Sequence, residues 1–178
     1  KYIWFFCCIL LLSIGFRAHG QNIVTSGFVE HLLVSDGIRL EIIRSDSTSV
    51  EIVTSELPDN CLDYSLEHGK LTLKIPSSIS CKGEVGILLK VPYLKSITVT
   101  GNAEVSTRNL IKTDSLLVMQ RSGGVAYLDL DVSYLKIDAS EGSMLRAEGY
   151  AVYQDISLST KASFSAFELE GKIVNIVY

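Results

Sequence analysis

The sequence predicts an all-β protein, and three observations support this prediction. Beyond residue 20 the chain is rich in Val, Ile, Leu, Ser, Thr and Tyr, and signals for helix are scarce. Short stretches alternate apolar and polar residues with a period of two, as half-buried strands do. From Ser96 onward, similar residues recur about every 20 positions. A repeat of this length with two short strands per unit predicts a parallel β-helix, or β-solenoid, whose turns we call rungs.

Residues 1–20 predict a secretory signal peptide that is cleaved before Gln21. Lys1 precedes an apolar stretch, and Ala18 and Gly20 provide small residues at the cleavage site. A membrane anchor is the alternative, but the apolar stretch stops at Arg17, short of the roughly 20 residues that a span needs. We therefore expect an exported chain without an integral span in its mature part, located in the periplasm, on the outer-membrane surface or outside the cell.

Residues 21–178 are expected to form one domain. The sequence begins with Lys rather than Met and ends at Val177 and Tyr178, inside an alternating stretch. A domain seldom stops halfway along a strand, so we expect a fragment that lacks the initiator residue and some C-terminal rungs.

The charge of the chain argues against nucleic acid as a partner. The formal net charge is -4, and it falls to about -6 once Lys1 and Arg17 are removed with the signal peptide. Nucleic-acid binding needs a basic patch, and an anionic membrane surface also attracts cations.

The N-terminal half predicts an irregular β region that caps the solenoid. Its alternating stretches are separated by turn residues such as those at 35–37, 45–47 and 68–70. These predicted strands cover residues 38–42, 50–52, 71–75 and 85–91. Two cysteines of the mature chain, Cys61 and Cys81, are also here. In an oxidising compartment they can form a disulfide, and the alternative is two buried free thiols.

Inward-facing residues of the repeats form two aliphatic ladders. The first predicted ladder is Ile97, Leu116, Leu135, Ile156 and Ile176, and the second is Val99, Val118, Ile137, Leu158 and Tyr178. In the second strand of each rung the predicted inward sets are Ala126/Leu145/Ser165, Leu128/Ala147/Phe167 and Leu130/Gly149/Leu169. Stacked rungs, with equivalent strands about 4.8 Å apart, would bury a continuous core. We expect the solenoid to be right-handed.

Side chains alternate along a strand, so the same register predicts outward ladders. These are Tyr127/Arg146/Ala166, Asp129/Glu148/Glu168, Asp131/Tyr150/Glu170 and the apolar set Val125/Met144/Phe164. The acidic ladder, Asp129, Glu148 and Glu168, is either a solvated face or a weak Ca²⁺ site or docking face for a basic partner. The apolar set is either a partner surface or is covered by a loop.

Three stretches resemble a known family. Residues 28–30 (FVE) lead into residues 34–40 (VSDGIRL), residues 91–101 read VPYLKSITVTG, and residues 114–116 (DSL) precede Gly123 and Gly124. This order and spacing is similar to the head GIN domain family, named as auto-transporter adhesins of exported Bacteroidota proteins, although Arg39 replaces the Asn of its name motif. The resemblance covers most of residues 24–178. It implies a β-helical extracytoplasmic domain, and it transfers no catalytic residues.

No catalytic constellation is evident. His31 and His68 are isolated, a Gly-x-Ser-x-Gly motif is absent, and neither a cofactor nor a metal beyond the acidic ladder is indicated. The predicted function is a non-catalytic binding or adhesion module for a surface glycan or protein. The alternatives are an envelope scaffold that associates end to end through the solenoid ends, and a polysaccharide-active enzyme that uses Tyr127, Tyr150 or Tyr153 as sugar platforms.

Overall fold

The computed structural model describes residues 21–24, 27–54, 61–78, 81 and 84–178, and every regular element in them is a β-strand. The all-β prediction is therefore confirmed, while the predicted signal peptide at residues 1–20 lies outside the described residues. In the described part of the chain there is no helix that could cross a membrane. The strands are β1 (Gln21–Val24), β2 (His31–Val34), β3 (Arg39–Arg44), β4 (Ser49–Ile52), β5 (Asp63–Glu67), β6 (Lys70–Lys74), β7 (Gly86–Val91), β8 (Ser96–Val99), β9 (Glu104–Thr107), β10 (Ile111–Gln120), β11 (Val125–Ala139), β12 (Met144–Leu158), β13 (Ser163–Glu170) and β14 (Ile173–Val177).

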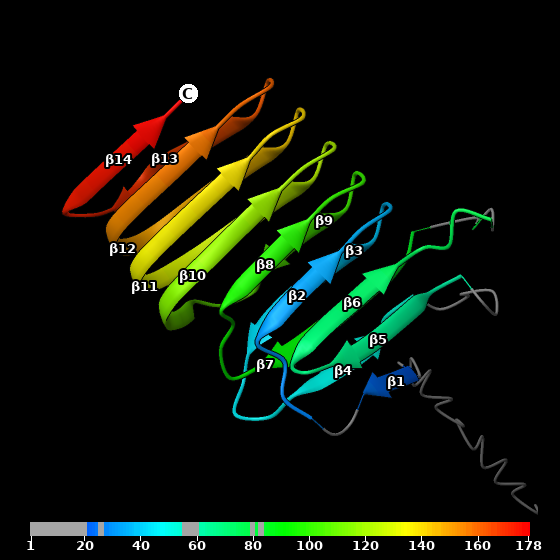
Figure 1. Cartoon of the computed structure of the whole chain (residues 1–178). Helices are drawn as coiled ribbons and strands as arrows, with labels where there is room; N and C mark the ends of the chain where they lie inside the picture. Colours follow the sequence, from blue (N-terminus) through cyan, green and yellow to red (C-terminus); the bar gives the residue numbers. More distant parts are fainter. Residues whose placement is uncertain (1–20, 25–26, 55–60, 79–80, 82–83) are drawn as a thin grey trace, which may run out of the picture.

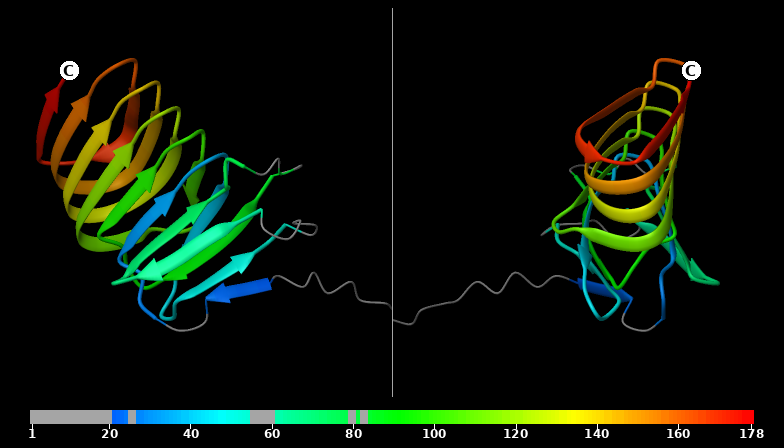
Figure 2. Two further views of the ribbon diagram at one scale, coloured as in Figure 1. Left: turned by 45° about the vertical axis from the view of Figure 1, so that its right-hand side comes forward. Right: turned by 90° about the vertical axis from the view of Figure 1, so that its left-hand side faces the viewer.

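All the strands belong to one mixed sheet that curls around its own core (Figure 1). Parallel pairing dominates, and the antiparallel pairs β1–β4, β4–β7 and β5–β6 gather in the N-terminal part. Figure 2 shows the strands of the C-terminal half following one another in successive coils along one direction. The four predicted N-terminal strands correspond to β3, β4, β6 and β7.

The long strands β10, β11 and β12 lie side by side in parallel, each offset by 19 residues from the next. Ile111 pairs with Leu130, and Val125 pairs with Met144. The pairing skips Asp114, Ser133 and Val152, so the three strands share one interruption. This interruption falls where the strands curve round the core, and it divides each strand into two arms (Figure 2).

The inward ladders are buried as far as Ile137 and Ile156, whereas Ile176 is 42% exposed and Tyr178 91% exposed, and their register is partly wrong. Leu116 pairs with Leu135 and Val118 with Ile137, as predicted, and all four side chains are buried. However, Ile97 pairs with Val118 rather than Leu116, Leu135 with Gln154 rather than Ile156, and Ile137 with Ile156 rather than Leu158. Each error is two residues, because a two-residue slip keeps the same face inward and the apolar pattern cannot distinguish the two registers.

The inward sets predicted for the second strand of each rung are correct between β11 and β12 and partly wrong at β13. Ala126 pairs with Leu145, Leu128 with Ala147 and Leu130 with Gly149, as predicted. In β13, Leu145 pairs with Phe164, Arg146 with Ser165 and Met144 with Ser163, each one residue from the prediction. A register shift between Arg146 and Glu148 accounts for the difference, and it leaves Phe167 99% exposed instead of inward. Beyond the shift, Glu148–Glu168 and Gly149–Leu169 pair as expected.

Left-handed turns are stacked along one corner of the sheet. Amides and carbonyls link them in series: Gly37 donates to Gly101, Asn102 to Ser122, Gly123 to Glu141 and Gly142 to Thr160, at 3.0–3.1 Å. Positive φ angles occur in every one of these turns, which are Asp36–Gly37, Gly101–Asn102, Ser122–Gly123, Glu141–Gly142 and Thr160–Lys161. The Gly, Asn, Asp and Ser residues in these turns tolerate or favour such conformations, so the chain reverses at the same corner each time.

Candidate functional site

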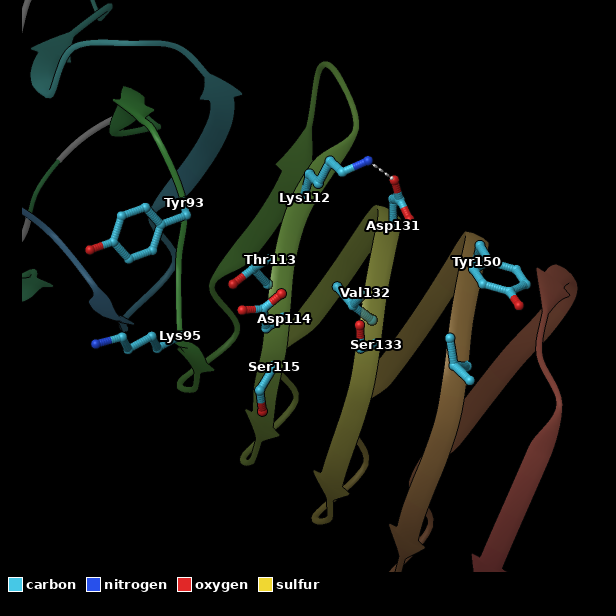
Figure 3. Close-up of a pocket in the computed structure, with 11 residues that line it drawn as sticks. Tyr93, Lys95, Lys112, Thr113, Asp114, Ser115, Asp131, Val132, Ser133 and Tyr150 are labelled. Atoms are coloured by element: carbon cyan, nitrogen blue, oxygen red, sulfur yellow. Dashed lines mark ion pairs between the residues drawn. The ribbon is translucent and has the colours of Figure 1, made fainter.

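A cleft of about 870 Å³ lies over the interruption shared by β10, β11 and β12, and we call it the bend cleft (Figure 3). One side comes from the segment between β7 and β8, and the rest comes from the three long strands. The lining residues are Tyr93, Lys95, Lys112, Thr113, Asp114, Ser115, Asp131, Val132, Ser133, Tyr150 and Val152.

Parallel pairing places the polar lining in rows across the strands. Lys112 pairs with Asp131, which pairs with Tyr150, so three neighbouring strands contribute to one row. Asp114 and Ser133 follow at the interruption, where their side chains are exposed to solvent. A row of this kind presents groups at the strand spacing of about 4.8 Å.

The charges of the bend cleft nearly balance. Lys112 Nζ lies 2.8 Å from Asp131 Oδ2, and both side chains remain partly exposed. An exposed pair of this kind contributes at most about 1 kcal/mol to stability, so its main effect is to orient the two side chains. Lys95 adds a second positive charge and Asp114 a second negative charge. No ion pair in the described part of the chain involves Asp114, which is exposed.

Glu30 does not line the cleft, but it contacts Tyr93 and Lys95, which form one wall of it. Its Oε1 accepts a hydrogen bond from Tyr93 Oη at 2.8 Å. The same oxygen forms an ion pair with Lys95 Nζ, also at 2.8 Å. The amide of Lys95 also donates to the Glu30 carbonyl at 2.7 Å, which ties the two backbones together. Hydrogen bonding from Lys95, and then from Tyr93, holds the pKa of Glu30 below its ordinary value. Conversely, Glu30 raises the pKa of the Tyr93 phenol and the pKa of the Lys95 amine.

The residues of the acidic ladder pair in the predicted register, but in the described part of the chain they do not form a metal site. Asp129 pairs with Glu148, and Glu148 pairs with Glu168. Glu148 Oε1 is held by Arg146 Nη2 at 2.6 Å, beside a separate hollow of about 310 Å³. Throughout the described ranges, no three His, Cys, Asp or Glu side chains are close enough together to hold a metal ion.

Comparison with protein-family models gives a match over residues 30–178, to the family described as "Putative auto-transporter adhesin, head GIN domain". The chain belongs to the head GIN domain family. The resemblance seen in the sequence is thereby confirmed. A search of the curated proteins finds no match.

Solved structures support the fold of this head GIN domain. A putative adhesin from Parabacteroides merdae is 18% identical with a TM-score of 0.63, over 86% of this chain and 74% of that one. A putative adhesin from Parabacteroides distasonis is 15% identical with a TM-score of 0.60, over 89% and 79%. Another P. distasonis structure, described as a putative lipid binding protein, is 15% identical with a TM-score of 0.63, over 88% and 77%. At these identities the likeness shows the fold alone.

The other predicted site residues of this head GIN domain are dispersed. His31 Nδ1 lies 2.8 Å from Ser96 Oγ, and His68 is exposed in the turn between β5 and β6. The structure pairs the sulfurs of Cys61 and Cys81 as a disulfide, with Cα atoms 5.7 Å apart. Met144 pairs with Val125 and is 40% exposed, but Phe164 belongs to a different row, so the predicted apolar outer ladder is incomplete.

Sequence reasoning missed the bend cleft. Of the three tyrosines considered as sugar platforms, Tyr150 lines it, Tyr127 lines the hollow beside the acidic ladder, and Tyr153 is 48% exposed. Asp131 and Tyr150 were placed on one outward ladder, and continuing that ladder back by 19 residues reaches Lys112. That spacing was the available signal for the site.

Proposed function

We propose that this head GIN domain is a non-catalytic, extracytoplasmic binding module of the adhesion type, with the bend cleft as its binding site. The observation that supports this proposal is the cleft itself. It combines about 870 Å³ of open volume with tyrosines, hydroxyls and a balanced set of charges on a rigid sheet. Concave sites with a few placed polar groups are the usual locations for ligands. The family description as an adhesin agrees with such a role.

We also propose that the curled sheet is a right-handed parallel β-solenoid with rungs of about 20 residues, capped by the antiparallel N-terminal strands. The constant offset of 19 residues between β10, β11 and β12 supports this interpretation. The series of turns stacked along one corner supports it as well. A solenoid would present the bend cleft on a stiff surface whose rows repeat from rung to rung.

Export is part of the proposal, with the periplasm, the outer-membrane surface and the medium as possible destinations. The composition of residues 1–20 and the adhesin description of the family support export. N-terminal sequencing of the chain recovered from outside the cytoplasm should begin at Gln21. A chain in that fraction that still carries the residues before Gln21 would contradict cleavage of a signal peptide.

Binding is tested by screening the exported chain on an array of glycans and matrix proteins. Two variants separate the candidate surfaces. The pair Tyr93→Ala and Tyr150→Ala together alters the bend cleft, and Asp129→Asn, Glu148→Gln and Glu168→Gln together neutralise the acidic ladder. We expect reproducible binding that the first variant loses and the second keeps. A folded chain that binds nothing on the array contradicts the adhesion function, and release of reducing or unsaturated sugar would indicate a polysaccharide-active enzyme instead.

A second candidate function is a structural scaffold of the envelope that associates end to end. The observation that favours it is β5, which pairs with β6 alone at an end of the strand order and has four exposed residues. A strand at an open edge of a sheet can recruit further strands. Sedimentation velocity over a hundredfold range of concentration tests this function. A constant monomer contradicts the scaffold, and a continuous increase in size supports it.

A further inference from the structure

We propose that the bend cleft binds a neutral, extended oligosaccharide whose chain runs across the strands, between Tyr93 and Tyr150. This inference rests on the proposed binding function and adds the chemical class and orientation of the ligand. Three features support it: the aromatic residues at the ends, the hydroxyl-rich floor and the balance of charges.

Tyr93 and Tyr150 lie at opposite ends of the cleft (Figure 3). Tyr93 is 42% exposed, and its hydroxyl is fixed by Glu30 at 2.8 Å, so the ring is held in place before a ligand arrives. Tyr150 is half-buried on β12. Tyrosine offers a large amphipathic surface at low cost in conformational entropy, and the apolar faces of pyranose rings stack on such surfaces. Two tyrosines at the ends can therefore define two sugar subsites.

Between these ends the floor is lined with small hydroxyl side chains. Thr113 and Ser115 come from β10, and Ser133 comes from β11. A hydroxyl donates one hydrogen bond and accepts two, as each sugar hydroxyl does. The carboxylate of Asp114 adds acceptors, and the ammonium of Lys112 adds donors. This mixture satisfies a polyol better than it satisfies an apolar ligand, which would leave these groups without hydrogen bonds.

The charges favour a neutral ligand. Lys112 is paired with Asp131 at 2.8 Å, and Lys95 is paired with Glu30 at the same distance. The exposed Asp114 is then the remaining charge of the lining, and it is negative. The chain as a whole also carries a net charge of -4. Asp114 and the negative net charge of the chain would both repel an acidic polysaccharide. A neutral glycan would instead use Asp114 as a hydrogen-bond acceptor.

The pairing of the strands leaves side chains to face the cleft along β11 and β12. Strand β11 lies between β10 and β12, and β12 is paired with β11 on one side and with β13 and β14 on the other. On β10, β8 pairs only with Leu117–Gln120, so Lys112, Thr113 and Ser115 pair with β11 alone. An extended peptide usually binds by adding a strand to such an edge, and the matrix proteins in the experiment below test that outcome. Three strand steps from β8 to β12 span roughly 14 Å, a length suited to a short run of sugar units.

The experiment measures binding of the full exported chain to purified oligosaccharides in three sets, neutral, acidic and basic, and to matrix proteins. Hits are then quantified by calorimetry at low and high salt. We expect neutral glycans to bind with little dependence on salt, because screening weakens only charged contacts. Tyr93→Ala and Tyr150→Ala should each weaken binding about tenfold. Tyr93→Phe should retain most of the affinity because it keeps the ring. Tyr127→Ala, an exposed tyrosine outside the cleft, is the matched control and should not change binding.

The outcomes separate this inference from the proposed function. Binding of acidic or basic ligands, or of proteins, that Tyr93→Ala and Tyr150→Ala abolish would overturn the neutral-glycan inference and keep the cleft as a binding site. Neutral-glycan binding that these substitutions leave unchanged would overturn the location. A chain that is folded and binds none of the four sets would overturn both proposals. Circular dichroism of each variant, compared with Tyr127→Ala, shows whether a loss of binding comes from unfolding.

Discussion

The carboxylate of Glu30 accepts hydrogen bonds from Lys95 and Tyr93, and this arrangement gives the wall of the bend cleft a measurable signature. Because these bonds favour the ionised form, the pKa of Glu30 in the folded chain lies below its ordinary value of 4.5. The associated stability is present above the unfolded-state pKa and is lost as pH falls through the folded-state pKa.

We expect an NMR titration to give a midpoint for Glu30 below 4.5, and we expect Lys95→Gln to move it upward, since the Lys95 hydrogen bond is the largest cause of the shift. Thermal melts of the two chains should differ most above pH 4.5 and converge in acid. A Glu30 midpoint at or above 4.5 in the unsubstituted chain would show that the cluster does not persist in solution.

Gly149 is a second position where one residue determines the local structure. Its φ is +99°, and a Cβ there would lie close to the Leu130 carbonyl on the neighbouring strand. We predict that Gly149→Ala lowers the free energy of unfolding by about 3 kcal/mol, from backbone strain together with steric overlap. Gly142→Ala is the matched control, because Gly142 has a φ of +72° and open space around its Cβ position.

The control should cost about 1 kcal/mol, from backbone strain alone. Urea denaturation of both variants gives the comparison. Equal losses for Gly149→Ala and Gly142→Ala would mean that β11 and β12 do not approach as closely as the structure shows.

At the scale of elements, the Cys61–Cys81 disulfide connects the start of β5 to the segment that precedes β7. The two cysteines are separated by 20 positions, and closing a loop of this size is expected to stabilise a fold by roughly 3 kcal/mol. We predict that Cys61→Ala together with Cys81→Ala lowers the free energy of unfolding by that amount. Alanine avoids placing a new polar group at the buried Cys61 position.

Reduction of the unsubstituted chain with dithiothreitol should reproduce the same loss, while it leaves the double variant unchanged. Mass spectrometry after thiol labelling reports the state of the cysteines directly. Two labelled thiols in the oxidised, exported chain would refute the disulfide and support the alternative of free thiols.

The faces of β8, β10, β11 and β12 could be predicted from the sequence, and their registers only in part. The row of Asp129, Glu148 and Glu168 is predicted correctly, because side chains alternate and the inward residues therefore determine which residues face outward together. Ile97 was assigned to the wrong partner because a shift of two residues preserves the buried face. Phe164 was misplaced because the register shift between Arg146 and Glu148 has no signature in the apolar pattern.

The bend cleft could be predicted only in part, from the spacing of Lys112, Asp131 and Tyr150, and for a different reason. Its floor lies where Asp114, Ser133 and Val152 interrupt the pairing, and periodicity describes the paired residues on either side of such an interruption. Tyr93 and Lys95 enter from a segment between strands, whose position depends on a tertiary contact with Glu30. Sequence periodicity therefore predicts the regular scaffold well, and it predicts poorly a site that forms where the scaffold is irregular.

At the scale of the whole molecule, the arrangement of strands determines how stability is distributed. Strands β11 and β12 have hydrogen-bonded neighbours on both sides, and β10 has them from Leu117 to Gln120. The inward residues Leu116, Leu135 and Ile156 of these strands are buried. By contrast, β14 pairs with β12 alone, and β5 lies at an end of the strand order. In a stack where each strand contacts mainly its neighbours, stability propagates between neighbours rather than through one common core.

Amide hydrogen exchange should therefore be slowest in β10, β11 and β12 and fastest in β5 and β14. Leu135→Ala removes a side chain with 0% exposure and should cost 2–5 kcal/mol, accelerating exchange in β10, β11 and β12 first. Leu110→Ala, at a position that is 43% exposed, is the matched control and should leave the pattern unchanged. If Leu135→Ala instead accelerated every strand equally, including β3 and β7, the molecule would unfold as one cooperative core, and the proposal of a stack of rungs would fail.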